Sequence, residues 1–499
     1  MSTTPAPRDP HYPVAHLRPP RNWINDPNGL VFHDGHYHVF YQYNPYGATH
    51  ANMHWGHFRS PDLLTWEPLP IALSPTTGGV DADGCFSGNA VSDGDRLVAF
   101  YSAHREDRSP QHQPVTCAVS HDDGRTFSPR AELLIPELPE DCTMYRDPYV
   151  WQDDGGWRML VGAALADGRA AALLYDSPDL ETWTYRGPFA AREKEPIVGT
   201  SLHTGEGWEC SQYLPAASGP GALVFSAWNL DDGPQCVAAL MGEEHGDVFE
   251  AGPPVLVDHG PDCYAPALLR APGNRWLLWG WSWEARDEAW AVADRWAGVL
   301  TLPREIHVDG DGTLRQQPAT ELLALRGEHI IHAAGATHGP QPVDLGSVSR
   351  AFDLTARLEP TGNAGLRLLT TPDGSEYLDI RLDVDAGELV VDRDHASLDP
   401  RARGGSYRMP CATDRPVELR MVVDHSIAEI FLTTTGQVLT LRFYPTGQGA
   451  WRLQAHSTPG TRLGHAIDVW ELHPLVIKEP STGAPPRSRG RRAGAPSGT

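Results

Sequence analysis

Apolar and polar residues alternate in short runs through roughly the first 300 residues, and tight polar turns separate these runs. Five times, a polar or aromatic residue leads into two strand-like runs joined by such a turn; the five are Asp26, Ser87, Asp147, Glu209 and Tyr264. They stand 61, 60, 62 and 55 residues apart. Two apolar runs joined by a pair such as Asp-Gly indicate a β-hairpin. The pattern therefore predicts five hairpin-containing units of similar length.

A second repeat is interleaved with the first. The sequence SPDLLTW at 60–66 recurs as SPDLETW at 177–183, and a looser copy, SHDDGRTF, lies at 120–127. Repetition near 60 residues, with about four strands per repeat, is typical of propeller blades. We therefore predict an all-β fold with a five-bladed β-propeller over 16–306, in which equivalent strands face one central axis. The alternative is an ordinary all-β protein whose hairpins have polar turns.

The pattern changes after about residue 306. Residues 307–330 predict a linker with a short helix, because TELLALRGEH carries apolar residues at helical spacing. Strict alternation over 331–477 predicts a C-terminal antiparallel β-sandwich. We expect a flexible N-terminal segment over 1–15. The Pro-, Gly-, Ser- and Arg-rich tail over 478–499 is predicted to be disordered.

Composition narrows the class of partner. The formal net charge of −24 repels phosphate groups, so we expect neither nucleic acid nor an anionic membrane as a partner. The seven Cys are odd in number and form no Cys-x-x-Cys pair, which favours reduced thiols over a disulfide framework or a zinc site. The N-terminus shows no signal peptide and the chain no long apolar run, so a cytoplasmic location is expected.

A propeller would gather Asp26, Asp147 and Glu209 in one polar funnel. Three uses of such a cluster are open: glycoside hydrolysis, metal binding and structural turns. A retaining glycosidase needs a carboxylate nucleophile and a carboxylic acid whose pKa values are pushed apart. No His-x-x-x-His or aspartate-rich calcium loop coincides with the three acids, so we predict no metal.

The neighbours of the three acids suggest how their pKa values differ. Asn25 and Asn28 could donate hydrogen bonds to Asp26 and favour its ionised form. The apolar neighbours of Glu209 would raise its pKa and keep it protonated. Arg146 would hold the adjacent Asp147 ionised. Sugars have apolar faces, and aromatic residues could supply matching walls, although core packing is the alternative for each; the candidates are Trp23, Trp55, Phe86 and Tyr264.

At these residues the chain resembles glycoside hydrolase family 32, which contains invertases, fructanases and sucrose-6-phosphate hydrolases. The motifs are WINDPNGL at 23–30, YRDP at 145–148 and WEC at 208–210, and the resemblance runs from about residue 16 to 475. It implies Asp26 as the nucleophile, Asp147 as the transition-state stabiliser and Glu209 as the acid/base.

Further motifs, YQYNP, HWGH, FSG, CYAP and GW, match the same family. The resemblance implies these substrate-binding residues: Trp23, Asn25, Gln42, Trp55, Phe86, Ser87, Arg146, Tyr264 and Trp281. One departure follows Cys210, where the family usually continues with Pro and then Asp or a similar residue, and this chain has Ser211 and Gln212. The departure leaves the leaving-group preference open.

We therefore expect a retaining glycosidase that cleaves terminal β-D-fructofuranosyl units through a covalent fructosyl-enzyme, with no cofactor. Its partner is a small carbohydrate, such as sucrose, sucrose 6-phosphate or a fructo-oligosaccharide. The alternatives are a non-catalytic fructan-binding propeller, an inverting glycosidase with the same blade number, and fructosyl transfer to a sugar acceptor. The sequence does not decide whether the substrate is phosphorylated.

Overall fold

The computed structural model describes residues 9–109, 111–153, 155–216, 219–447 and 449–479. Strands dominate the described part of the chain, which has one α-helix, α1 (Glu288–Asp294), and two 3₁₀ helices, η1 (Pro272–Asn274) and η2 (Thr320–Leu325). Within these ranges, no helix is both long and apolar enough to cross a membrane. Residues 480–499 of the predicted tail lie outside the described residues, as do residues 1–8 of the predicted flexible segment.

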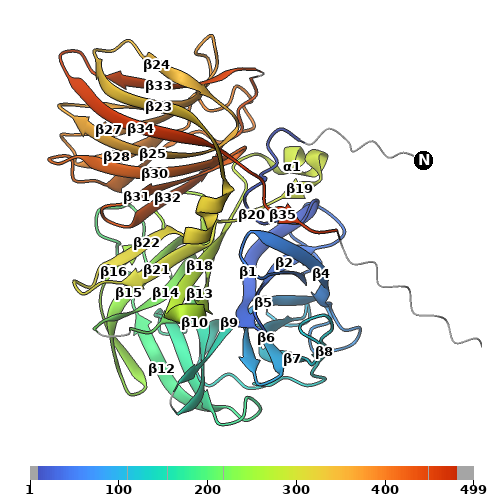
Figure 1. Ribbon diagram of the computed structural model, residues 1–499. Coiled ribbons are helices and arrows are strands. Elements are labelled where there is room, and N and C mark those ends of the chain that lie inside the picture. Colours follow the sequence, from blue (N-terminus) through green and yellow to red (C-terminus); the bar gives the residue numbers. More distant parts are fainter. Residues whose placement is uncertain (1–8, 110, 154, 217–218, 448, 480–499) are drawn as a thin grey trace, which may run out of the picture.

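Residues 22–318 form five antiparallel sheets, each built on four strands that follow one another along the chain (Figure 1). Sheet 1 holds β1 (Asn22–His33), β2 (His36–Asn44), β3 (His54–Ser60) and β4 (Thr65–Leu73), with the short strands β19 (Trp296–Ala297) and β35 (Val476–Ile477) at its edges. Sheet 2 holds β5 (Gly84–Asp93), β6 (Arg96–His104), β7 (Val115–Ser120) and β8 (Ser128–Pro129).

The next three sheets repeat this order. Sheet 3 holds β9 (Cys142–Asp153), β10 (Gly156–Leu165), β11 (Ala170–Ser177) and β12 (Thr184–Arg192). Sheet 4 holds β13 (Gly207–Leu214), β14 (Gly221–Asn229), β15 (Gly233–His245) and β16 (Val248–Leu256). Sheet 5 holds β17 (Tyr264–Ala271), β18 (Arg275–Ser282), β21 (Arg304–Val308) and β22 (Leu314–Pro318), and β20 (Val299–Leu300) also pairs with β18.

The first strands of the five sheets lie side by side. β1 contacts β5, β5 contacts β9, β9 contacts β13, and β13 contacts β17. β17 in turn contacts β1, so these innermost strands close a ring. Such an arrangement is consistent with a β-propeller.

The SPDL repeat forms the turn between the third and fourth strands of sheets 1 and 3. In sheet 1 the carboxylate of Asp62 accepts hydrogen bonds from the backbone N–H groups of Leu64 and Thr65, and Asp179 repeats this arrangement in sheet 3. Leu63 takes a positive φ of 64° in this turn. A short acidic side chain can satisfy the exposed N–H groups of a tight turn, which explains why the motif recurs.

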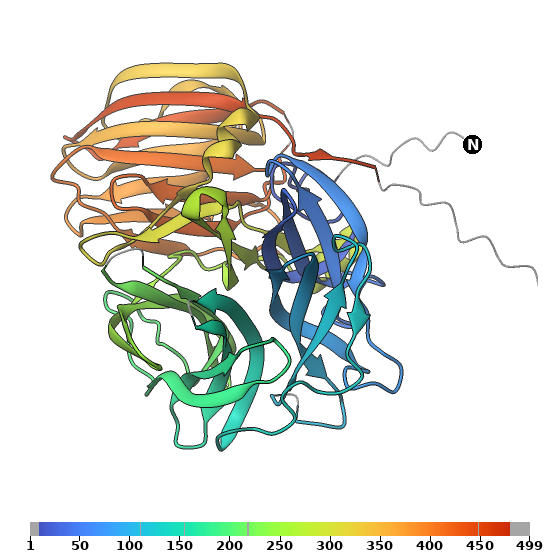
Figure 2. The ribbon, with the colours of Figure 1, turned by 60° about the horizontal axis from the view of Figure 1, so that its bottom comes forward.

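Two six-stranded sheets face each other over residues 326–472, which is consistent with the predicted β-sandwich (Figure 2). One sheet holds β23 (Arg326–His338), β34 (Arg462–Leu472), β25 (Ala351–Pro360), β30 (Val417–Asp424), β31 (Ile427–Leu432) and β32 (Gln437–Arg442). The other holds β24 (Val343–Val348), β33 (Trp451–Ser457), β26 (Ala364–Thr370), β27 (Leu378–Asp383), β28 (Glu388–Asp392) and β29 (Ser406–Pro410). Alternate residues of β27 and β30 are buried in one core between the sheets.

The connection between the two halves differs from the predicted linker over 307–330. Residues 314–318 form β22, which pairs with β21 and belongs to sheet 5. The helical spacing at 320–325 does form a helix, but a 3₁₀ helix that buries Leu322 and Leu325. β23 starts at once, at Arg326, and lies in the sandwich. The two halves are therefore joined by residues 319–325, most of which form this short 3₁₀ helix.

A buried network of charges crosses between the halves. The imidazole of His16 lies 2.9 Å from Asp424 Oδ2 and 3.1 Å from Glu429 Oε1 in the sandwich. Arg304, in sheet 5, donates to Glu429 and to Asp258. The described part of the predicted flexible segment, residues 9–15, also reaches the sandwich, because the N–H groups of residues 14 and 15 donate to Asp424. The network fixes how the two halves pack.

Candidate active site

Each innermost strand of the ring carries a β-bulge, where two of its residues face one residue of the neighbouring strand. The five pairs are 25–26, 86–87, 147–148, 210–211 and 265–266. A bulge bends its strand and turns a side chain away from the regular alternation. Asp147 and Cys210 take positive φ angles of 62° and 47° there. All five predicted motif residues lie in these bulges or directly before them.

Asp26 lies in the bulge of β1 and is half-buried. Ser87, in the bulge of β5, donates a hydrogen bond of 2.5 Å to Asp26 Oδ2. Asn25 donates to Asp26 Oδ1 at 3.0 Å and itself accepts from the indole N–H of Trp23 at 2.8 Å. Asn28 does not take part as expected; its amide oxygen accepts from the backbone N–H of Gly88 at 3.4 Å. Both oxygens of the Asp26 carboxylate are therefore held in place by side chains.

Glu209 precedes the bulge of β13 and is 9% exposed. Arg146 donates to its Oε1 at 3.1 Å, and the Tyr264 hydroxyl donates to its Oε2 at 2.8 Å. Burial raises the pKa of Glu209, whereas the charge of Arg146 and the bond from Tyr264 lower it, with burial the larger effect. This direction agrees with the sequence-based expectation of a carboxyl that keeps its proton.

Asp147 is also buried, in the bulge of β9. Its Oδ2 accepts a hydrogen bond of 3.1 Å from the backbone N–H of Cys210. Burial, followed by the charge of Glu209, raises the pKa of Asp147 to about 7. The expectation that Arg146 keeps Asp147 ionised was therefore wrong, because Arg146 donates to Glu209 and its effect on Asp147 is smaller than that of burial.

The structure brings the three acids into one cluster. The thiol of Cys210 lies 3.8 Å from Asp26 Oδ2 and 3.7 Å from Asp147 Oδ2. The negative charge of Asp26 acts to raise the pKa of both Asp147 and Glu209. Burial raises the pKa of two of the carboxyl groups, those of Asp147 and Glu209, and a third faces them, which suits acid/base and nucleophilic chemistry on one bond.

Aromatic rings stand beside the cluster on the side of sheets 1 and 5. Trp23 and Trp281 meet edge to face, with ring centroids 5.7 Å apart. Trp283 extends this wall, since it meets Trp281 at 5.7 Å and stacks on Tyr264 at 5.3 Å. Sequence reasoning missed Trp283, although it follows Trp281 at the spacing of residues on one face of a strand.

Two predicted substrate contacts lie beneath the site. Trp55 has no exposed surface, and its indole N–H donates to the backbone oxygen of Phe86 at 3.1 Å. Gln42 is 1% exposed and donates to the backbone oxygen of Cys85 at 3.0 Å. Both side chains anchor the start of β5. Trp55 therefore supports Phe86 and Ser87 from below and does not form a wall of the funnel.

His50 is a site residue that sequence reasoning missed. It lies in the loop between β2 and β3 and is exposed. Its ring lies 5.8 Å from that of Trp23 and 6.2 Å from that of Phe86, and the charge of Asp26 acts on its pKa. Phe86 in turn lies 4.5 Å from the ring of His104. An isolated His in a loop carries no periodic signal, so only the fold could place it.

Among the described residues, one group of side chains has the spacing of a metal site. It consists of His329, His332 and Asp468, which lie on exposed strands of the sandwich. Both imidazoles approach the same oxygen of Asp468, at 2.9 and 2.7 Å. The group is separate from the three acids of the ring.

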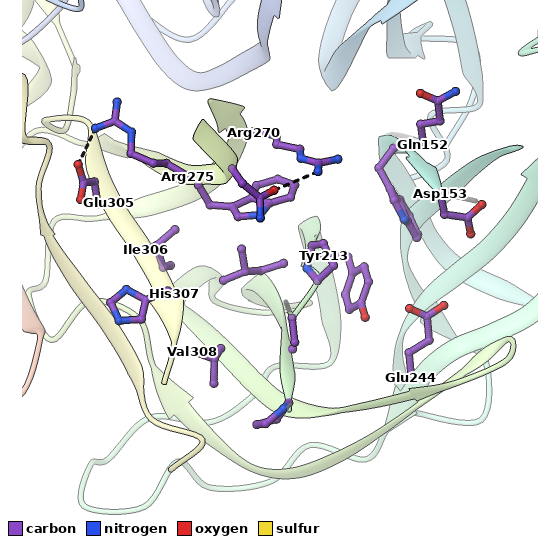
Figure 3. A pocket seen from close by; sticks show the side chains of 18 of the residues that line it. Gln152, Asp153, Tyr213, Glu244, Arg270, Arg275, Glu305, Ile306, His307 and Val308 are labelled. Carbon is purple, nitrogen blue, oxygen red and sulfur yellow. Dashed lines mark hydrogen bonds and ion pairs between the residues drawn. The ribbon is translucent and has the colours of Figure 1, made fainter. Parts of the chain in front are cut away.

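Cavities adjoin the ring at different places. One of about 690 Å³ lies at the far ends of β9, β13 and β17, lined by residues such as Tyr213, Arg270 and His307 (Figure 3). None of the predicted site residues lines that cavity. Cavities of about 620 Å³ and 410 Å³ instead adjoin the acid cluster, the first through His50 and Phe86 and the second through Trp23 and Trp281.

Comparison with known proteins links this geometry to one family. The model described as "Glycosyl hydrolases family 32 N-terminal domain" matches residues 16–318, and "Glycosyl hydrolases family 32 C terminal" matches residues 321–471. The chain is 32% identical to a raffinose invertase of Escherichia coli, over 92% of this chain and 95% of the relative. It is 29% identical to a sucrose-6-phosphate hydrolase of Bacillus subtilis (strain 168), over 93% of this chain and 95% of the relative.

Solved structures resemble the whole fold. The crystal structure of fructan 1-exohydrolase IIa from Cichorium intybus superimposes with a TM-score of 0.82 at 22% identity, covering 95% of this chain and 99% of that one. The structure of sucrose-6-phosphate hydrolase from Lactobacillus gasseri gives a TM-score of 0.79 at 23% identity, covering 93% and 94%. Identities this low establish the shared fold alone.

Proposed function

The chain belongs to glycosyl hydrolases family 32 and hydrolyses fructosides, and we propose that it does so as a retaining β-fructofuranosidase acting through Asp26 and Glu209. The substrates are sucrose and related fructosides with a terminal β-D-fructofuranosyl unit. The proposal is carried by one observation. Three carboxyl groups from separate sheets share a site in which Glu209 favours its protonated form and Asp26 is held by Ser87 and Asn25.

The first step breaks the glycosidic bond. A carboxylate oxygen of Asp26 attacks the anomeric carbon of the fructosyl unit, and Glu209 gives its proton to the departing oxygen. The products of this step are the free alcohol and a fructosyl ester of Asp26. Burial raises the pKa of Glu209, which favours the protonated form needed for this step. Arg146 then stabilises the carboxylate that remains, because it donates to that carboxylate at 3.1 Å.

The second step releases fructose. The ionised Glu209 takes a proton from water, whose oxygen attacks the anomeric carbon and frees the Asp26 carboxylate. Asp147 binds fructosyl hydroxyls beside the reacting carbon. With a pKa raised to about 7 by burial and by the charge of Glu209, its carboxyl group can donate as well as accept a hydrogen bond near neutral pH.

The proposal includes the architecture around the site. The five sheets, over residues 22–318, form the five blades of a propeller, supported by the closed ring of innermost strands and by five bulges at equivalent positions. The sandwich, over residues 326–472, forms a second domain. A cytoplasmic location is supported by relatives named sucrose-6-phosphate hydrolase, because charged sugar phosphates are confined to the compartment in which they are made.

Replacing the nucleophile tests the chemistry. Asp26→Asn should lower kcat/KM on sucrose by about four orders of magnitude or more, because an amide cannot form the ester. Asp34→Asn, in the β1–β2 turn, is the matched control and should keep full activity. Far-ultraviolet circular dichroism checks that both variants are folded. Substantial sucrose cleavage by a folded Asp26→Asn variant would refute the assignment.

Product analysis separates the remaining alternatives. A retaining enzyme releases β-fructofuranose first, which proton NMR detects before the anomers equilibrate, whereas an inverting enzyme releases the α form. Equal amounts of glucose and fructose from sucrose indicate hydrolysis, and a deficit of fructose indicates transfer to a sugar acceptor. Sugar binding without any release would indicate a non-catalytic protein.

A further inference from the structure

A cavity of about 620 Å³ opens next to the acid cluster, on the side of sheets 1 and 2. It shares His50 and Phe86 with the catalytic site, and Phe86 directly precedes Ser87, the residue that donates to Asp26. A group bound in the catalytic site and one bound in this cavity would therefore touch the same two rings. Its volume lies in the range of pockets that hold small ligands.

Aromatic rings continue from the catalytic site into the cavity. Trp23, His50, Phe86 and His104 follow one another with centroid separations of 5.8, 6.2 and 4.5 Å. Tyr46 stands at the rim with 76% of its surface exposed. A tyrosine left this open beside a pocket offers an apolar face to a ligand that also has polar groups, such as a sugar ring.

Charge in the cavity is negative. Asp83 and Glu106 line it, and the backbone N–H of Glu106 donates to Asp83 Oδ2 at 2.8 Å, which holds the two residues together. No Lys or Arg lines this cavity in the part of the chain that the structure describes. The charges of Arg105 and Arg146 act on Asp83 and His104 of the lining, but each guanidinium pairs with an acid outside the cavity, Asp107 and Glu209 respectively.

Three histidines complete the polar lining. Burial lowers the pKa of His54 and His104, and for His104 this effect exceeds the opposing pull of Asp83. Neutral imidazoles each offer one donor and one acceptor, which suits hydroxyl groups. They add no positive charge to offset the two acids.

From this lining, we propose that the cavity receives the leaving group of the fructoside and selects an uncharged glycosyl unit over a phosphorylated one. The inference rests on the proposed function and names its substrate class. Hydroxyl groups of a neutral sugar donate to the two carboxylates and the imidazoles. A phosphate dianion in the same place faces the two like charges of Asp83 and Glu106, with no Lys or Arg among the described lining residues, an arrangement that discriminates against it.

Substrate competition tests the inference. The kcat/KM values for sucrose and sucrose 6-phosphate are measured at low ionic strength with the purified full chain. We expect the wild type to favour sucrose by at least about tenfold. In the double variant Asp83→Asn/Glu106→Gln, the value for sucrose should fall severalfold and the value for sucrose 6-phosphate should rise, so that their ratio drops by about tenfold.

A matched control removes two acids elsewhere. Glu243 and Glu250 face each other across β15 and β16, are largely exposed, and lie outside the site. Glu243→Gln/Glu250→Gln changes the net charge equally and should leave both kcat/KM values unchanged. A wild type that prefers sucrose 6-phosphate, or an acid-cavity variant whose ratio moves no more than the control, would overturn the inference. Failure to release fructose from either sugar would instead overturn the proposed function.

Discussion

Removing one hydroxyl group should move the alkaline limit of activity. The Tyr264 hydroxyl donates to Glu209 Oε2 at 2.8 Å and also lies 3.1 Å from the backbone oxygen of Ala227. This bond lowers the pKa of Glu209 against the larger, raising effect of burial. The variant Tyr264→Phe keeps the ring and its stacking on Trp283 while it removes the donor. The pKa of Glu209 must then rise further.

The size of the shift follows from the strength of the lost bond. A hydrogen bond to a charged group contributes about 1.5–3 kcal/mol, and about 1.4 kcal/mol corresponds to one pKa unit. We therefore expect a rise of about one to two units. In the proposed mechanism Glu209 must be protonated to cleave the substrate, so the alkaline limb of kcat/KM should move by that amount toward higher pH. Asp147, with a pKa of about 7, titrates together with Glu209. The alkaline limb of kcat/KM therefore reports the two carboxyl groups as a pair and not one of them alone.

The assay is the pH dependence of kcat/KM on sucrose, which reports the groups of the free enzyme. Tyr175→Phe is the matched control, because the Tyr175 hydroxyl forms a buried bond of 2.9 Å with Tyr145 in sheet 3, away from the acids. Tyr175→Phe should lower the free energy of unfolding without moving the alkaline limb of kcat/KM. An alkaline limb that stays in place in Tyr264→Phe, or moves to lower pH, would refute the account of Glu209.

Three further predictions concern other contacts. Ser87→Ala removes the 2.5 Å bond to Asp26 and should lower kcat/KM on sucrose by about 10- to 100-fold, measured against unchanged thermal unfolding. His16→Ala removes one buried partner from both Asp424 and Glu429, although backbone N–H groups still donate to Asp424, and should lower the free energy of unfolding by about 3 kcal/mol in denaturant titrations. In the wild type, the acidic partners of His16 raise its pKa against the opposing effect of burial, so its contribution to the free energy of unfolding is complete below about pH 6.5 and declines as the pH rises. The pKa of Asp424 is lowered, chiefly by its hydrogen bond to His16 and against the effect of burial. The contribution of Asp424 to the free energy of unfolding is therefore complete above about pH 4 and declines at lower pH. Burial raises the pKa of the Cys210 thiol well above its usual value, so this thiol should resist iodoacetamide at pH 8 in the folded protein and react in denaturant, as peptide mass mapping would show.

Much of the site was predictable because the signal repeats. Spacing near 60 residues marked Asp26, Ser87, Asp147, Glu209 and Tyr264, and the structure places all five at the bulges of the ring. A bulge adds one residue to its strand and shifts the phase of the alternation, but a short strand does not show which residue is the extra one or where its side chain points. The sequence could therefore indicate which residues converge, but not how their side chains are aimed.

Residues outside the repeat were harder to place. Trp55 lies in a matching motif, yet its ring supports the site from beneath with no exposed surface. His50, five positions earlier in a loop, has no motif and lies between Trp23 and Phe86. Whether an aromatic residue faces a sugar or the core depends on which side of a strand or loop is open. That choice is made by packing between sheets, which a single sequence does not display.

A single sequence does not show side-chain direction either, which is why the expectation that Arg146 keeps Asp147 ionised was wrong. Arg146 is its neighbour along the chain, but a residue and its neighbour in a strand point in different directions, and the guanidinium of Arg146 reaches Glu209 at 3.1 Å. Asp147 instead accepts from the backbone N–H of Cys210 and from the Ser102 hydroxyl, in a buried setting that raises its pKa to about 7. The guanidinium group of Arg146 therefore contacts Glu209, the residue whose charge changes in the proposed reaction. In the proposed mechanism Glu209 becomes a carboxylate when the leaving group departs, and Arg146 is already in place to stabilise it, whereas Asp147 would bind the sugar without a change of charge at that step.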